Sequence, residues 1–345
     1  MYFDIRPKER REDLFDREEE IEKIKRSMDK PLIVVSGIRR IGKTSVIKVA
    51  LNEIDRPSLF IDVRGFPMNY GRKYLYSKIA NALSKLRSKS VINVLKKVRG
   101  VSIFGFNIEL AWSGRRMVFL TELFEALDEA GFVIVFDEAQ NLRGPLSQEI
   151  LSAIAYAYDN CRNLCFILSG SEAGLLYDFL GIENPDSPLY GRYFVEVTLN
   201  RFTRKQSIDF LVEGFRQAGK NIPISVIEEA VDMLDGIPGW LTFYGAKCIE
   251  GYCNPVYVRE LAVKLAIREL KNIVKNRSRR YKLVLKAIAL GYDSWSQVKE
   301  YVESIEGKTV SKGILYKVLR GLEKMSIVSK YRFLDPIYME AAKRL

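Results

Sequence analysis

Histidine is absent from the 345 residues of the chain, and this absence removes several classes of chemistry. Hydrolases that rely on a Ser-His-Asp or Cys-His arrangement, metal sites built on histidine and histidine pH switches are all excluded. Any reaction must therefore use carboxylates, lysine, arginine, hydroxyl groups or a bound metal ion.

Cysteine is scarce. The chain has four, which form neither a CxxC pair nor the framework of a secreted protein: Cys161, Cys165, Cys248 and Cys253. Cysteine inside cells commonly behaves as a small apolar residue. We therefore expect all four to be buried and reduced, with no metal or redox role.

Long apolar runs are missing as well. No stretch approaches the roughly 18 residues that span a bilayer, and the N-terminus lacks the apolar core of a signal peptide. We therefore expect a cytoplasmic protein that does not enter a membrane. Its length exceeds that of one ordinary core, which predicts two or three domains.

A complete phosphate-binding loop is present between a predicted strand at 31–36 and a predicted helix that begins at Ser45. Its glycines allow backbone N–H groups to surround a polyphosphate, Lys43 meets the β- and γ-phosphates, and the Thr44 hydroxyl can ligate Mg²⁺. The pattern and its context predict a site for ATP or ADP. The residues are consecutive: Gly37, Ile38, Arg39, Arg40, Ile41, Gly42, Lys43 and Thr44, with Ser45 next.

Two acidic residues supply the second half of the predicted site. Asp137 ends an apolar strand and is expected to hold Mg²⁺ through water, whereas Glu138 is expected to orient and deprotonate the attacking water. Ser169, at the end of the next strand, is a candidate to hydrogen-bond the attacking water or the γ-phosphate, or it simply begins a turn. Arg192 is the candidate cation for the transferring phosphoryl group, in its own chain or a neighbouring one, unless it is an ordinary surface arginine.

Strands and helices alternate through residue 200. Apolar runs near 31–36, 58–64, 132–138, 164–169 and 193–197 predict strands, and the segment 101–112 predicts an inserted hairpin around Gly105. This alternation indicates an α/β core with a parallel, doubly wound sheet. From residue 201 the pattern is helical, with expected capping boxes at Thr203 and Ser225 and a long helix from Pro255 to Val274.

The last region predicts a winged helix-turn-helix domain, with helices near 279–290, 294–303 and 311–324 and a ribbon at 327–333. Residues 271–345 hold 17 Lys and Arg against 7 Asp and Glu, which leaves +2 of the net +12 for the first 270 residues. Lys312, Lys317 and Arg320 are expected on the outer face of the third helix, where they would contact duplex DNA. The alternative is that this face contacts a protein. The apolar positions expected to face the core are Ile314, Leu315, Val318, Leu319 and Leu322.

Taken together, these motifs resemble the archaeal ATPase family of P-loop proteins, which is related to AAA+ and STAND ATPases and to origin-recognition initiators. The resemblance covers nearly the whole chain and implies a P-loop ATPase core over 1–200, a helical lid over 201–274 and a winged-helix domain over 275–345. It also implies that Arg17 and Pro238 lie at the nucleotide. Further motifs that carry it are 15–21, 169–171, 189–192, 236–241 and 334–336, with Asp16 where relatives usually have glycine.

The favoured function is a Mg²⁺-dependent switch that binds and hydrolyses ATP. In this hypothesis, contacts from Lys43, Thr44 and Arg192 to the γ-phosphate bias the lid, and the lid repositions a DNA-binding tail at 275–345. The alternative is a regulatory scaffold that holds nucleotide and uses the winged helix for protein contacts. A homo-oligomer or another protein partner is left open.

Overall fold

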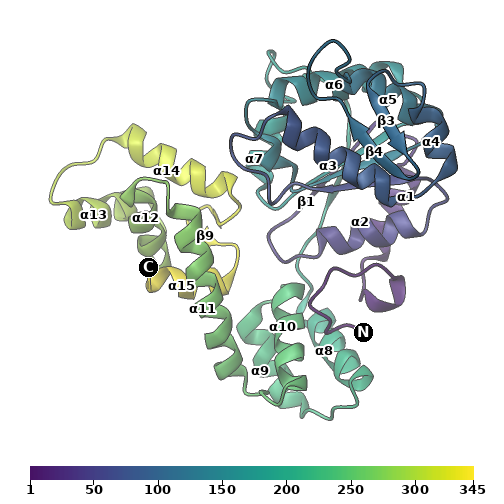
Figure 1. The fold of residues 1–345 in the computed structure, drawn as a ribbon. Coiled ribbons are helices and arrows are strands. Elements are labelled where there is room, and N and C mark those ends of the chain that lie inside the picture. Colours follow the sequence, from purple (N-terminus) through teal and green to yellow (C-terminus); the bar gives the residue numbers. More distant parts are fainter.

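The computed structural model describes residues 1–345 and shows an α/β core joined to a helical half (Figure 1). Five strands form one sheet in the order β2-β5-β6-β1-β7, and every neighbouring pair is parallel. The parallel sheet predicted from the alternating pattern is therefore confirmed. The strands are β1 Leu32–Ser36, β2 Ser58–Asp62, β5 Val133–Asp137, β6 Cys165–Gly170 and β7 Val195–Thr198.

Helices cover both faces of this sheet, because successive side chains of a buried strand point to opposite faces. Val35 and Val135 pack on the face of α1 and α2, whereas Val34 and Ile134 pack on the face covered by the other core helices. The core helices are α1 Glu18–Arg26, α2 Lys43–Asn52, α3 Arg72–Lys85, α4 Lys89–Leu95, α5 Leu120–Glu129, α6 Ser147–Asn160 and α7 Ala173–Leu180.

The predicted hairpin is present between α4 and α5. Strands β3 (Val101–Phe104) and β4 (Asn107–Leu110) pair in antiparallel fashion, and Gly105 turns between them with a φ of +62°. Ile108 and Leu110 point into the core, and the backbone N–H of Ile108 donates to the Ser84 hydroxyl of α3 at 2.9 Å. The hairpin is thereby fastened along α3.

The helical half consists of the predicted lid and winged helix, which share one apolar core. Trp240 of α10, Val263 of α11, Leu315 of α14 and Tyr338 of α15 all belong to the same buried cluster. The boundary near residue 275 therefore does not separate two cores. The elements are α8 Arg204–Gln217, α9 Ile224–Leu234, α10 Pro238–Ile249, α11 Pro255–Val274, α12 Arg279–Ala289, α13 Trp295–Glu306, α14 Lys312–Lys324, β8 Val328–Ser329, β9 Arg332–Phe333 and α15 Pro336–Lys343.

Of the local predictions for the helical half, the capping box at Thr203 is confirmed, whereas the capping box at Ser225 and the burial of Ile314 are wrong. Thr203 forms both bonds of a capping box at α8, whereas α9 begins after Pro223 with no side-chain cap, so Ser225 does not cap it. Ile314 is exposed, because it lies at the edge of the helical stripe that runs through Leu315 and Val318 into the core. None of the helices has the length and apolar character that crossing a bilayer requires.

The cysteine prediction is wrong for one pair. Cys161 and Cys165 are buried and free, as expected, but Cys248 and Cys253 form a disulfide. The chain turns back after α10 at Gly251, which has a φ of +100°, and this turn brings the two Cα atoms to 4.3 Å. The pairing is decided by the turn and leaves no sequence pattern of the CxxC kind.

Candidate nucleotide site

The carboxyl ends of four neighbouring strands meet at one edge of the sheet. β1 leads into the phosphate loop, β2 towards Arg64, β5 into Glu138 and β6 into Ser171. The register pairs Asp62 directly with Asp137 across β2 and β5. Ligands of open α/β sheets bind outside the carboxyl ends of the strands, so the fold gathers these distant residues where a ligand is expected.

The phosphate loop depends on its two glycines. Gly37 has a φ of +148°, and a Cβ there would lie 2.8 Å from the carbonyl oxygen of Leu199. Gly42, with a φ of +101°, is the N-cap of α2, so the first N–H groups of the helix face the loop. Ser45 connects the start of α2 to the N-terminal segment, because its hydroxyl accepts a hydrogen bond from the backbone N–H of Lys8 at 3.0 Å.

Lys43 is buried within the loop. Its Nζ donates to the carbonyl oxygens of Gly37 at 2.8 Å and Ile38 at 3.0 Å. Burial lowers the pKa of this amine to about 8, although the carboxylates of Glu138 and Asp137 oppose the shift. A polyphosphate in the loop would supply the negative charge that this buried cation lacks.

Asp137 and Ser169 are buried, and they form a hydrogen-bonded group with the half-buried Thr44. The hydroxyl of Thr44 donates to Oδ2 of Asp137 at 2.8 Å, and the hydroxyl of Ser169 donates to Oδ1. Burial raises the pKa of Asp137. A threonine hydroxyl beside a carboxylate is a hard oxygen donor pair that fits Mg²⁺, which completes its shell with water and phosphate oxygens.

The sequence predicts that Ser169 reaches the attacking water or the γ-phosphate. The structure places it fully buried beneath Asp137, and its hydroxyl also accepts the backbone N–H of Glu138 at 3.2 Å. Ser169 therefore positions the two acidic residues. The neighbouring Ser171 contacts the Glu138 carboxylate instead.

Glu138 is held in one orientation. Its backbone adopts the left-handed conformation, with a φ of +60°, which a residue with a side chain adopts mainly where its surroundings enforce it. Its Oε2 accepts bonds from Gln140 Nε2 at 2.6 Å and from the hydroxyl of Ser171 at 2.7 Å. Burial alone would raise the pKa of Glu138, but the charge of Lys43 and these hydrogen bonds hold it below its ordinary value.

A cavity of about 460 Å³ lies beside these groups. Its polar end includes Lys43, Thr44 and Glu138. The other end is formed by aromatic and apolar side chains from the N-terminal segment and the lid, which suits an adenine ring between flat apolar walls. These are Phe15, Phe202, Phe210, Pro238, Trp240 and Phe243.

Of the two residues that the family resemblance implies at the nucleotide, one lines the cavity and the other does not. Pro238 lines the cavity, at the first turn of α10. Arg17 does not: its guanidinium donates to Glu20 at 2.9 Å and to the carbonyl oxygen of Asn200 at 2.6 Å, and it lies over the ring of Phe202. Phe15, two residues earlier, takes the place at the cavity wall.

Arg64 is a site residue that the sequence motifs did not identify. It follows β2, pairs with Asp62, and lines the same cavity as Lys43 and Glu138. An adjoining polar cavity of about 440 Å³ is also lined by Arg64 and Glu138. The signal was available in the sequence as a cation directly after a core strand, but only the strand order places β2 beside β5.

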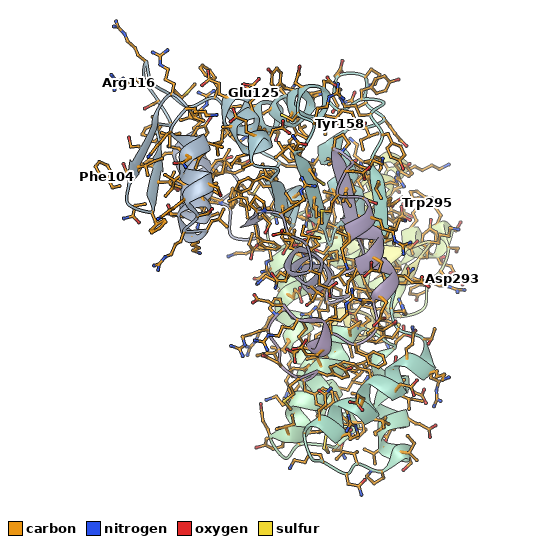
Figure 2. All side chains as sticks on the ribbon, turned by 90° about the vertical axis from the view of Figure 1, so that its right-hand side faces the viewer. Phe104, Arg116, Glu125, Tyr158, Asp293 and Trp295 are labelled. Atoms are coloured by element: carbon orange, nitrogen blue, oxygen red, sulfur yellow. A yellow bond between two sulfur atoms is a disulfide. The ribbon has the colours of Figure 1, made fainter.

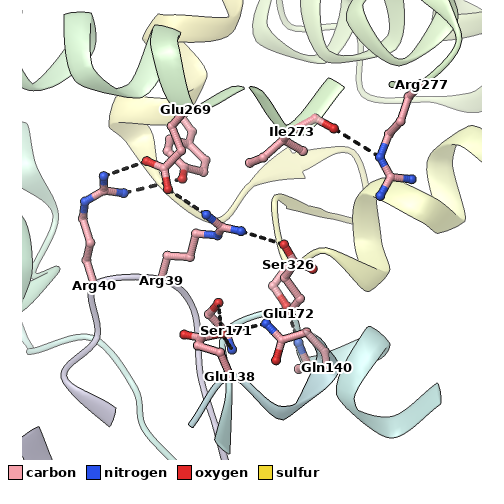
Figure 3. Close-up of polar contacts among 12 residues, drawn as sticks. Arg39, Arg40, Glu138, Gln140, Ser171, Glu172, Glu269, Ile273, Arg277 and Ser326 are labelled. Carbon is pink, nitrogen blue, oxygen red and sulfur yellow. Dashed lines mark hydrogen bonds and ion pairs between the residues drawn. The ribbon is translucent and has the colours of Figure 1, made fainter. Parts of the chain in front are cut away.

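The side chains of Arg39 and Arg40 leave the phosphate loop and reach the helical half (Figure 3). Glu269 of α11 lies between them, at 2.8 Å from Arg39 and 2.7 Å from Arg40. Arg39 also pairs with Glu172 after β6 at 2.6 Å. The loop backbone thus remains free for phosphate, while its two arginines connect it to the lid.

Arg192 lies at the amino ends of the strands, opposite to the carboxyl ends that form the candidate site. It precedes β7, where this parallel strand begins, and it pairs with Asp159 near the end of α6 and lies over the ring of Tyr158. The part of the prediction that brought Arg192 to the γ-phosphate of its own chain is therefore wrong. The physical reason is that a residue before a parallel strand and one after it are separated by the length of the sheet.

Comparisons with known proteins agree with this geometry. A profile of ATPase domains predominantly from Archaea matches residues 14–242, and a profile of the C-terminal winged helix-turn-helix domain of MCM proteins matches residues 275–334. A comparison with curated proteins gave no match.

Two solved structures are similar over nearly the whole chain. The Walker-type ATPase PABY2304 of Pyrococcus abyssi has a TM-score of 0.86 and 37% identity, with 100% of both chains covered. The ORC2 protein of Aeropyrum pernix, solved in ADPNP and ADP complexes, has a TM-score of 0.60 and 14% identity, with 99% of this chain and 96% of that chain covered, which shows a shared fold alone. From the profile match over most of the chain and the 37% identity along its full length, we conclude that the chain belongs to the family of ATPase domains found predominantly in Archaea.

Proposed function

We propose that the protein is a Mg²⁺-dependent ATPase whose nucleotide state controls a DNA-binding winged helix. The observation that supports the ATPase most strongly is the gathering of Lys43, Thr44 and Glu138 around one cavity with an apolar end for a base. Lys43 binds the β- and γ-phosphates, and the loop N–H groups orient them. Thr44 and, through water, Asp137 would hold Mg²⁺, and the bound ion would neutralise charge on the phosphate oxygens.

Glu138 is the proposed general base. Its lowered pKa keeps the carboxylate ionised at neutral pH, and the bonds from Gln140 and Ser171 keep it in one orientation beside the cavity. A base must be charged and correctly placed before it accepts a proton from water. Arg64 is the proposed cation for the developing charge on the phosphoryl group, in place of Arg192 of the same chain.

Two contacts connect the site to the winged helix. Glu269, bound to the loop arginines, belongs to α11, which shares the core of the helical half. At the other contact, Lys324 at the end of α14 pairs with Asp178 of α7 at 2.8 Å, and the N–H of Ala173 donates to the hydroxyl of Ser326 at 3.1 Å. A shift of the segment after β6 would thus bear directly on α14, and a shift of the phosphate loop would bear on α11.

The winged helix presents cations for duplex DNA. Lys312 and Lys317 on α14 are exposed and form no ion pair, while Arg320 is exposed and pairs only with Glu323 of the same helix. Lys330 and Arg332 are exposed in the ribbon β8-β9. A helix entering a groove and a wing along the backbone both need such side chains.

The test uses the whole chain, because the shared core makes residues 275–345 unsuitable as a fragment. Binding to a labelled duplex is measured over a salt series, with and without a non-hydrolysable ATP analogue. Replacing Lys312, Lys317 and Arg320 with alanine should reduce the salt slope by up to about 2.7, at about 0.9 for each phosphate contact. Replacing Lys205 and Lys220 with alanine, both exposed on the lid, is the control for the loss of surface charge elsewhere.

The regulatory scaffold remains a second candidate, and one observation favours it. Ile314 and Tyr316 are 44% and 57% exposed on α14, and Tyr316 lines a small cavity with Trp295 and Gly313. Exposed apolar side chains of this kind suit a protein partner. Duplex binding that is absent at low salt, or insensitive to the three alanines, would favour the scaffold over the DNA-binding switch.

A further inference from the structure

A second basic region lies within the ATPase core. Residues 64–116 contain twelve Lys and Arg and a single acidic residue, Glu109, for a net charge of +11. Residues 271–345 carry +10, and the net charge of the whole chain is +12. The residues outside these two regions therefore carry −9. The near-neutral sum over residues 1–270 conceals this region. We call residues 64–116 the basic arm; this segment contains α3, α4 and the β3-β4 hairpin.

The cations of the basic arm are free to meet a ligand. All twelve side chains are exposed. Three form ion pairs, Arg64 with Asp62, Arg72 with Glu149 and Lys97 with Glu129, and the other nine have no acidic partner. Such a concentration of uncompensated charge repels itself unless an anion is nearby. The surface therefore suits a polyanion.

Aromatic side chains lie among these cations. Phe104 is 73% exposed at the outward face of the hairpin, and Phe106 and Trp112 follow it on exposed positions. Figure 2 shows Phe104 and Arg116 at the outer margin of the arm, away from the body of the protein. Lys73 of α3 lies 5.8 Å from the ring of Trp112, so rings and cations share one surface.

A groove leads from the basic arm towards the nucleotide site. It has a volume of about 500 Å³ and is lined by Lys78 and Lys85 of α3 and by Arg64. Thr44 of the phosphate loop lines its other side. A strand bound along α3 would thus reach the vicinity of the site.

We propose that the basic arm binds single-stranded nucleic acid, with phosphates on its lysines and arginines and bases on Phe104, Phe106 and Trp112. The rings favour a single strand over a duplex, because bases already stacked on each other offer no free face. The charge favours nucleic acid over an acidic protein, since a regular polyanion matches nine spaced cations. The inference is independent of the winged helix.

The experiment measures binding of the full-length protein to labelled oligothymidylate and oligouridylate over a salt series, and to vesicles with phosphatidylserine in phosphatidylcholine. One variant combines Lys85→Glu, Arg87→Glu and Lys89→Glu, all exposed and unpaired. A second combines Phe104→Ser and Phe106→Ser, and a third restores a ring as Phe104→Trp with Phe106→Ser. The control combines Lys205→Glu and Lys220→Glu on the lid.

The charge variant should reduce the salt slope by at least about 2.1, at about 0.7 for each contact to a single strand. The serine variant should bind about 5- to 150-fold more weakly for each stacked base lost, with the slope unchanged, and the ring in Phe104→Trp should restore part of this loss. Oligothymidylate and oligouridylate together show whether DNA or RNA is preferred. If the charge variant does not fold, the two ring variants still decide.

The proposal is overturned if the parental protein binds neither oligonucleotide at low salt, or if the charge variant and the serine variant both bind them as the control does. It is also overturned if the arm variants lose only vesicle binding, which would assign the arm to a membrane surface. Loss of oligonucleotide binding in the winged-helix alanine variant alone would overturn it too. Loss of duplex binding by that variant, with single-strand binding intact, would leave the proposal standing.

Discussion

The guanidinium carbon of Arg40 lies 4.0 Å from the ring centroid of Trp240, so a phosphate-loop side chain stacks on the lid. The indole N–H of Trp240 donates to Oδ2 of Asp335 at 2.9 Å, and Asp335 is the N-cap of α15. Three residues from the loop, the lid and the winged-helix region therefore form one continuous contact. Any displacement of Arg40 by a nucleotide must change this contact.

Lys43→Ala should weaken ATP binding by at least about 100-fold, because the side chain is the proposed partner of two phosphates, each charged bond being worth about 1.5–3 kcal/mol. Isothermal titration calorimetry measures the change. The fold should survive, since the buried amine has no salt bridge to lose. Unchanged affinity would contradict the assignment of the loop.

ATP binding should take up a proton near pH 8.5. The pKa of Lys43 is lowered to about 8 without a ligand, so the amine is largely neutral there, and phosphate charge raises that pKa and returns the proton. Calorimetry in two buffers of different ionisation enthalpy measures the uptake. Lys43→Arg, which stays protonated, should show none from this position, and equal uptake in both proteins would count against the prediction.

The lowered pKa of Lys43 also determines how the free energy of unfolding changes with pH. Between about pH 8 and pH 10.5 the unfolded chain holds the proton on Lys43 more tightly than the folded protein, so Lys43 contributes stability that rises with pH in this window. Lys43→Ala should remove this contribution. Chemical denaturation at pH 7.5 and pH 9.5, with Lys48→Ala as a second lysine variant, measures the difference.

Glu138→Gln should leave ATP bound and slow hydrolysis by about 100- to 10,000-fold, because the amide keeps the shape but cannot accept the proton. Asp137→Asn should instead weaken Mg²⁺ binding, so that hydrolysis needs a higher Mg²⁺ concentration, since a carboxylate is the stronger ligand. Single-turnover hydrolysis across a Mg²⁺ series separates the two. A parental rate for Glu138→Gln would place the base elsewhere.

Arg64→Ala should slow hydrolysis by about 100-fold while ATP affinity changes little, as expected of a cation that acts on developing charge. The matched control is Arg72→Ala, an exposed arginine that also has one acidic partner but does not line the cavity. Equal rates in the two variants would show that Arg64 has no part in the reaction.

Glu269→Gln should reduce the effect of nucleotide on duplex binding, because it weakens the bonds that join both loop arginines to α11. Glu260→Gln on the same helix removes a more exposed pair with Arg344 and should change the effect little. The measured quantity is the ratio of duplex affinities with and without the ATP analogue. An unchanged ratio in Glu269→Gln would mean that coupling takes another route.

The sequence by itself determined the parts whose physics is local. The phosphate loop, the Asp137 and Glu138 pair after an apolar strand, and the capping box at Thr203 each lie within a few residues, so their hydrogen bonds and backbone conformations can be inferred from neighbours along the chain. The charge of the basic arm is local too, and a count over a shorter window than residues 1–270 shows it.

Tertiary structure decided which side chains meet across long sequence distances. Strand order placed Arg64 at the site, and the parallel direction of β7 placed Arg192 at the opposite ends of the strands. The docking of the helical half gave Arg39 and Arg40 a carboxylate in Glu269. Nothing in the residues next to these arginines specifies such partners, because each pairing depends on the packing of separate layers. The sequence therefore names the groups that we propose to bind phosphate, and the fold alone shows how they are connected to the rest of the protein.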